Sequence, residues 1–157
     1  MSRDPAGVPR SPFSSGQRWR LTGIPRDALP LWPVLLLARL VMASVFWTSG
    51  RTKVEPGTWL TLSDTTVQLF RDEYRIALPG LAAWTAMLGE HLFPALLVIG
   101  LASRAAAGGL LGMTLVIELF VYPDAYNVHG PWAVCLLLII LRGAGPVSLD
   151  DLIVRRL

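Results

Sequence analysis

The sequence predicts an all-α fold, an integral membrane four-helix bundle with a short amphipathic outer helix between spans one and two. Composition is the first observation behind it: the 157 residues are 53% hydrophobic and 16% charged, against about 25% charged residues in ordinary soluble domains. The mean hydropathy is +0.51. The apolar residues also fall in runs long enough to cross a hydrocarbon core of ~30 Å, and most charges lie between the runs.

The chain is expected to consist of an N-terminal tail and one domain. Residues 1–30 are rich in Pro, Ser, Gly and Arg and predict a disordered cytoplasmic tail, whereas residues 31–157 predict one transmembrane domain. The first apolar run, Leu31–Gly50, has 20 residues and lacks the small-residue cleavage site of a signal peptide. It is therefore expected to remain as a signal anchor and to form the first span.

Three further spans follow in the sequence. They are predicted at Leu78–Leu101, Ala105–Tyr122 and Val128–Leu141. The last run has only 14 residues, so the fourth helix is expected to begin earlier, near Asn127. Gly108 and Gly112 form a small-xxx-small pair, which predicts a close approach of the third span to a neighbouring helix.

Basic residues predict the orientation. Nine Lys and Arg residues lie in the tail, in the link between spans two and three and after span four, whereas four follow spans one and three. Because positive residues stay on the cytoplasmic side, both termini are expected to be cytoplasmic. These topology signals also account for the net charge of +3, so nucleic acid is not an expected partner.

The segment Arg51–Ala77 is too polar to span a membrane. Ser63 or Asp64 is placed to cap a helix within it. The apolar residues of this helix share one face: Val67, Phe70 and Tyr74. We expect a short amphipathic helix on the outer surface or over the mouth of the bundle.

Ionisable side chains inside the spans mark the candidate site: Arg39, Glu90, His91 and Glu118. A charge at a helix centre costs about 2.5–3.5 kcal/mol on insertion scales, so these groups are expected to face the bundle interior. Counted from the span ends, Arg39 and Glu90 lie about 12 and 16 Å deep, which predicts a buried polar pair. Two interpretations stay open: a structural ion pair that fixes the register of two helices, or part of a proton or quinone-headgroup site.

Other polar residues predict a pocket or mouth on the outer side. Glu118 and Tyr122 recur at helical spacing on span three, and His129 lies near the outer end of span four. His91 lies about 100° around its helix from Glu90, so the two side chains cannot point at one spot. His91 is either a hydrogen-bonded packing residue or a member of this pocket.

Soft side chains raise the alternative of a metal site. Met87 and His91 share a helix face, and Cys135 is the only cysteine of the chain. Thioether and thiol ligands suit Cu(I), so these three residues are the candidate metal ligands. Methionine is also ordinary filler of apolar helices, and no Cys-x-x-Cys motif concentrates ligands here.

Several short motifs, in order, resemble the DoxX family of small bacterial integral membrane proteins with four transmembrane helices. The resemblance covers roughly Leu35–Ile153 and leaves out the tail. It rests on Ala38-Arg39-Leu40, Ser49-Gly50 with Lys53, Glu90 before Leu97-Val98-Ile99-Gly100-Leu101, Ser103-Arg104, and Gly143-Ala144-Gly145-Pro146 before Ser148-Leu149-Asp150. Finer features resemble the branch encoded near methanobactin-type peptide-modifying enzymes: Phe46-Trp47, Asp72-Glu73-Tyr74-Arg75, and Phe120-Val121-Tyr122-Pro123 with His129 and Trp132.

The resemblance implies a protein of the bacterial inner (plasma) membrane. It further implies an accessory component of a quinone-linked redox system or of an oxidative or copper-stress system, with membrane or oxidoreductase partner subunits. Quinone, or less directly copper, is the cofactor it suggests. An accessory subunit fits better than a self-sufficient enzyme, because no pair of histidines lies at the depth of a haem in the bundle core. The alternative is a small membrane transporter or a copper-handling protein that acts alone.

Overall fold

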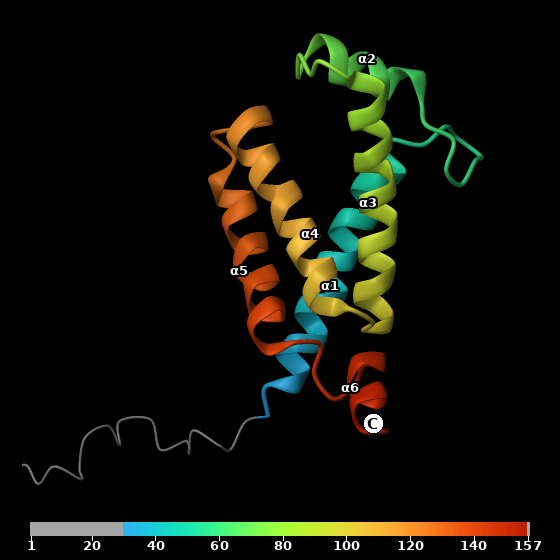
Figure 1. Cartoon of the computed structure of the whole chain (residues 1–157). Coiled ribbons are helices and arrows are strands. Elements are labelled where there is room, and N and C mark those ends of the chain that lie inside the picture. Colours follow the sequence, from blue (N-terminus) through green and yellow to red (C-terminus); the bar gives the residue numbers. More distant parts are fainter. Residues whose placement is uncertain (1–29, 157) are drawn as a thin grey trace, which may run out of the picture. The chain divides into compact units, whose positions relative to one another are not determined.

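The computed structural model of the chain describes residues 30–156, and residues 1–29 of the predicted tail lie outside the described part. Its long helices are α1 (Trp32–Arg51), α3 (Pro79–Ile99), α4 (Ser103–Val116) and α5 (Tyr126–Arg142). A π-helical turn, η1 (Ile117–Val121), continues α4. Two short helices, α2 (Asp64–Asp72) and α6 (Leu149–Val154), lie at opposite ends of the bundle (Figure 1). We call these the α2 end and the α6 end.

The lengths of the helices confirm the predicted membrane bundle. α1 has 20 residues, α3 has 21, and α4 with η1 has 19, and all three are long and apolar enough to cross a membrane. α5 has 17 residues and begins at Tyr126, close to the expected start. At 1.5 Å per residue, it is about 25 Å long, which is shorter than a hydrocarbon core of ~30 Å.

The surface of the bundle is apolar on most sides. Large hydrophobic residues stand exposed on every long helix, among them Leu37, Trp84, Leu115 and Val134. In water such a surface would aggregate, whereas in lipid it is the ordinary outer face of a membrane helix. The bundle is therefore built to contact lipid.

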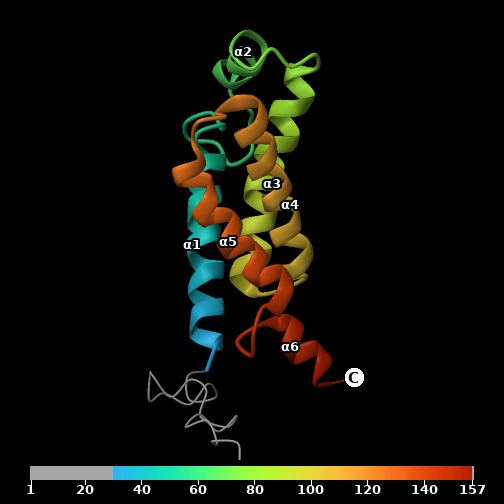
Figure 2. The same ribbon diagram turned by 90° about the vertical axis from the view of Figure 1, so that its left-hand side faces the viewer.

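The four long helices form a closed ring. α1 packs against α3 and α5, and α4 packs against α5 and α3. Two views at right angles show the four helices running side by side, with α2 at one end and α6 at the other (Figure 2). The tightly packed core includes Met42, Phe46, Leu97, Leu110 and Ile139, all of them almost fully buried.

A glycine determines how closely α3 and α4 approach. A Cβ atom added at Gly109 would lie 2.6 Å from the ring of Phe93, so only glycine fits there. Gly108 and Gly112 have no atom within 4 Å of the same position, and the prediction that these two mediate the close approach is wrong. The contact face of α4 lies one residue further around the helix, at Gly109.

A serine precedes each of the two short helices, but only one of them caps its helix. The backbone of Ser63 is extended before α2, and its side chain makes no capping hydrogen bond. At α6, the Oγ atom of Ser148 accepts a hydrogen bond from the Asp151 backbone N–H at 3.2 Å, so Ser148 caps this helix. Tyr74 lies beyond the end of α2, in the turn that leads to α3.

Candidate functional site

Arg39 is bound by backbone carbonyls at the α6 end. Its guanidinium donates to the oxygens of Leu97 and Val98 at 2.8 and 2.9 Å. It also donates to the oxygens of Ala144 and Val147 at 2.9 and 2.7 Å. The last carbonyls of a helix have no partner within it, and Arg39 supplies donors for two of them at the end of α3. Buried to 1% exposure, it joins α1, α3 and the segment after α5.

The prediction that Arg39 pairs with Glu90 is wrong. Glu90 instead accepts a hydrogen bond from Lys53, whose Nζ atom lies 2.6 Å from its Oε2 atom. Arg39 binds the carbonyl of Leu97, seven residues further along α3 than Glu90, which corresponds to about 10 Å of helix rise. Depths counted from span ends missed this offset, because the helices do not begin and end at the same level.

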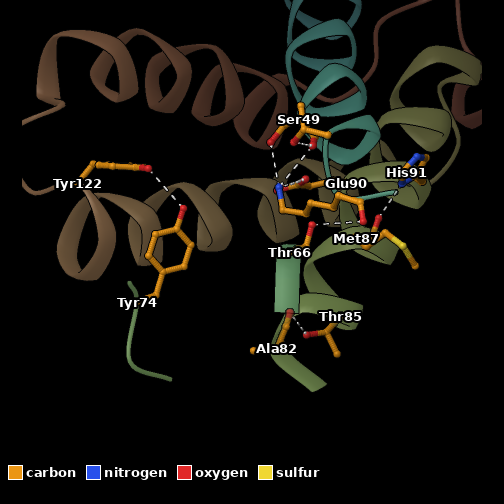
Figure 3. Close-up of polar contacts among 11 residues, drawn as sticks. Ser49, Thr66, Tyr74, Ala82, Thr85, Met87, Glu90, His91 and Tyr122 are labelled. Carbon is orange, nitrogen blue, oxygen red and sulfur yellow. Dashed lines mark hydrogen bonds and ion pairs between the residues drawn. The ribbon is translucent and has the colours of Figure 1, made fainter. Parts of the chain in front are cut away.

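Lys53 is the functional residue that sequence reasoning missed. It lies two residues beyond α1, but its side chain folds back into the bundle and is only 15% exposed. Its ammonium also donates to Ser49 Oγ at 3.2 Å and to the Ser49 carbonyl at 3.4 Å (Figure 3 shows Ser49 facing Glu90). The signal in the sequence was its spacing of four residues from Ser49, which continues the face of α1.

A cavity of about 930 Å³ occupies the half of the bundle toward the α2 end. Its walls come from all four long helices, with η1 and α2, and most of the lining is apolar. Phe46, Phe93, Met113 and Trp132 form part of these walls, and Gly112 borders the open space. A volume of this size is that of a pocket for a small organic ligand.

One polar group of the wall is the ion pair of Lys53 and Glu90, which lies between α1 and α3. Glu90 is 2% exposed, so its charge depends on the ammonium of Lys53. A buried carboxylate without a partner would be costly, which makes this pair a fixed part of the wall.

A short hydrogen bond joins Glu118 to His129. The Nδ1 atom of His129, in the first turn of α5, lies 2.5 Å from Oε2 of Glu118 in η1. The ring of His129 lines the cavity and lies 5.1 Å from the ring of Trp132. The two residues were expected at the mouth, and the structure brings them together.

Two tyrosines meet at the α2 end of the cavity. The hydroxyls of Tyr74 and Tyr122 lie 3.4 Å apart and share a hydrogen bond (Figure 3). Both residues line the cavity: Tyr74 lies between α2 and α3, and Tyr122 follows η1. Burial raises the pKa of Tyr74 above its ordinary value, and the hydrogen bond to Tyr122 raises it further.

His91 lies apart from this cavity. Its Nδ1 atom lies 2.7 Å from the carbonyl of Met87, and its ring packs on Trp47 with 5.0 Å between the centroids. A Cβ atom at Gly50 would come within 2.8 Å of the ring, so His91 faces α1 at close range. The structure therefore separates His91 from the pocket residues with which it was grouped.

The candidate metal ligands Met87, His91 and Cys135 are not part of a cluster of His, Cys, Asp and Glu side chains in the described residues. Met87 is fully buried, and Cys135 is partly buried against the apolar core. Within residues 30–156, no group of three or more His, Cys, Asp and Glu side chains is arranged to hold a metal ion. Met87 and His91 do share a helix face, as their spacing predicts.

The fold and the site define a class: an integral membrane four-helix bundle with a ligand-sized cavity inside its apolar helices. Within this class, the chain belongs to the DoxX family, whose family model matches residues 34–123. The match runs from α1 to the connection after η1, so Lys53, Glu90 and Glu118 lie inside it and His129 lies beyond it. No curated protein and no solved structure shows a significant match to this chain.

Proposed function

We propose that this protein binds the head group of a quinone and serves as an accessory component of a redox system in the bacterial inner membrane. The observation that carries the proposal is the cavity of about 930 Å³, with mostly apolar walls, one ion pair and the hydrogen-bonded pair of Glu118 and His129. Such a combination suits a molecule that dissolves in lipid and carries one polar end.

The position of the cavity favours a ligand that enters from the bilayer. Its lining lies within helices whose outer faces contact lipid, so a water-soluble substrate would first have to cross the mouth under α2. A quinone with an alkyl tail is already concentrated in the membrane. Its ring fits between Phe46, Phe93 and Trp132, where aromatic contacts add to apolar burial.

The chemistry of the wall favours an accessory role. Glu90, Lys53, Glu118 and His129 exchange protons and hydrogen bonds, and none of these side chains carries electrons. Cys135 is the only cysteine, so the chain offers no internal dithiol. We therefore propose an oxidoreductase partner that supplies or removes the electrons. The distribution of Arg residues supports an orientation with both termini in the cytoplasm.

The first experiment purifies the tagged protein from its own membranes in mild detergent and identifies bound proteins and lipids by mass spectrometry. We expect quinone and subunits of an oxidoreductase in stoichiometric amounts. A protein that emerges alone and without quinone would contradict the redox role.

The second experiment fills the cavity. Gly112 borders the open space and has no atom within 4 Å of a Cβ, so Gly112→Leu places a side chain there. We expect Gly112→Leu to weaken the binding of decylubiquinone at least about tenfold, measured by tryptophan quenching in lipid nanodiscs. Gly108→Leu is the matched control, because Gly108 is equally unobstructed on the same helix but does not line the cavity. Equal binding by both variants would overturn the assignment of the cavity.

The second candidate function is copper handling, or transport, by the protein alone. The observation that favours it is His91, whose buried Nε2 atom has no hydrogen-bond partner among the described residues. His91 follows Met87 by one helical turn, so a thioether and an imidazole share one face. The resemblance to a branch of the family tied to copper stress supports this candidate too. In the test, one Cu(I) ion bound per chain, and lost in both Met87→Leu and His91→Asn, would favour copper handling over the redox role.

A further inference from the structure

One ring nitrogen of His129 makes a hydrogen bond, and the other has no partner among the described residues. The Nδ1 atom lies 2.5 Å from the Glu118 carboxylate, and no residue of the described range 30–156 hydrogen-bonds to Nε2. The side chain is 8% exposed, and its ring lines the cavity. Because an ionised carboxylate only accepts hydrogen bonds, Nδ1 must carry the hydrogen. In the neutral ring, Nε2 is then left with a lone pair.

The strongest donor of the cavity wall is already occupied. The three hydrogens of the Lys53 ammonium have three acceptors, Ser49 O, Ser49 Oγ and Glu90 Oε2. The hydroxyls of Thr66 and Thr85 donate to backbone carbonyls. Of the hydroxyls shared by Tyr74 and Tyr122, one keeps a free hydrogen, at the mouth. Nε2 of His129, beside the ring of Trp132, is an open acceptor in mostly apolar surroundings.

We infer that the ring of His129 is neutral, and that its Nε2 atom recognises the ligand of the cavity by accepting a hydrogen bond from a hydroxyl group of that ligand. The cavity then prefers a hydroxylated ring, such as a quinol, over the corresponding quinone, which has only carbonyl acceptors at its polar end. This inference rests on the proposed function and specifies the form of its ligand. Glu118 is a positioning residue, because it holds the imidazole in the tautomer that leaves Nε2 open.

A purely structural role makes a different prediction. The pair of Glu118 and His129 also connects η1 to α5, and on that interpretation its loss would lower stability and weaken both ligands alike. Recognition by Nε2 requires instead that the two ligands respond differently. The ratio of the two affinities separates the interpretations, because an effect on folding cancels in it.

The test uses the full chain in nanodiscs under anaerobic conditions, with decylubiquinol and decylubiquinone as probes. We expect the wild-type protein to bind the quinol about tenfold more tightly, the effect of one hydrogen bond to an otherwise unsatisfied buried acceptor. His129→Phe keeps a ring and loses the acceptor, so it should bind both probes with the affinity of the wild type for the quinone. Glu118→Gln keeps an acceptor oxygen and should retain the preference, whereas Glu118→Leu should reduce it. Tyr126→Phe, at an exposed position of the same helix turn, is the control and should change nothing.

The outcomes are distinguishable. Equal binding of both probes by the wild type, or an unchanged preference in His129→Phe, overturns the inference and leaves quinone binding intact. Binding of neither probe by the wild type overturns the proposed function as well. Retained quinone binding shows that a variant is folded, and if His129→Phe does not fold, the wild-type ratio and the two Glu118 variants decide.

Discussion

The two ends of the bundle differ in the groups that bind a buried charged side chain. At the α6 end, Arg39 is buried and donates hydrogen bonds to four backbone carbonyls. At the α2 end, the buried charge of Glu90 is paired with Lys53 beside a cavity of about 930 Å³, and His129 is hydrogen-bonded to Glu118 in the same wall. Four of the five N–H groups of Arg39 are bound to backbone carbonyls, so this residue mainly joins helices. At the cavity, the ring of His129 keeps a nitrogen that a ligand can reach.

Removal of the Arg39 contacts should have the largest effect on stability. Arg39→Leu leaves several carbonyls without a donor, and since each unpaired group costs about 1–3 kcal/mol, we expect a loss of at least about 3 kcal/mol. Arg39→Lys should recover little, because an ammonium cannot reproduce the fork of the guanidinium. Thermal unfolding in detergent and yield in membranes measure the loss.

Arg104→Leu serves as the control for this prediction. Arg104 lies at the same end but is exposed, so its replacement should change stability by less than about 0.5 kcal/mol. If Arg39→Leu were as stable as the wild type, the carbonyls would have found other partners, and the contrast between the two ends would fail.

Disruption of the Lys53–Glu90 pair should have the second largest effect. Lys53→Met leaves Glu90 buried without its counter-charge and should cost about 3 kcal/mol in the free energy of unfolding. The double variant Lys53→Met with Glu90→Leu should regain most of this stability, because an apolar pair suits the same site. A double-mutant cycle of thermal unfolding measures the coupling. If the double variant is as unstable as Lys53→Met alone, the cost of Lys53→Met does not come from the unpaired carboxylate of Glu90, and this prediction is wrong.

The tyrosine pair at the mouth should have the smallest effect, visible mainly at high pH. The raised pKa of Tyr74 means that the unfolded chain loses this proton at a lower pH than the folded protein does. Stability from this group is therefore complete below about pH 10, the ordinary pKa of tyrosine, and falls as the pH rises above it. Tyr74→Phe removes this component of the alkaline loss. Unfolding of both proteins measured between neutral and alkaline pH checks the sign; parallel curves would show that Tyr74 does not contribute.

The sequence was sufficient for most of the fold, because hydropathy and helix ends are local properties. Apolar runs gave the four spans, and even the short fourth run was placed close to Tyr126. The cap of α6 is local too, because Ser148 and Asp151 are three residues apart. The helix contact at Gly109 was not, because three glycines lie within five residues of α4 and only the position of Phe93 distinguishes them.

The site was less accessible to sequence reasoning. Glu90 was identified by its cost in a membrane helix, but its partner Lys53 was counted among the loop charges. The partners of Arg39 are backbone carbonyls, which no side-chain pattern encodes. Glu118 and His129 were expected at one mouth, yet their pairing depends on the path of the chain between η1 and α5.

The π-helical turn accommodates one extra residue between α4 and α5. The Tyr122 N–H donates to the carbonyl of Ile117, five residues back, at 2.8 Å, so this turn contains one residue more than an α-helical turn. A deletion of one residue here, such as Leu119, would restore α-helical winding and leave Tyr122 at nearly the same angle around the axis of α4, because five residues of a π turn complete about the same rotation as four of an α turn. Close relatives are therefore expected to tolerate the loss of one residue at the exposed positions Leu119 and Phe120 better than a loss within α4, which would rotate Tyr122 by about 100°.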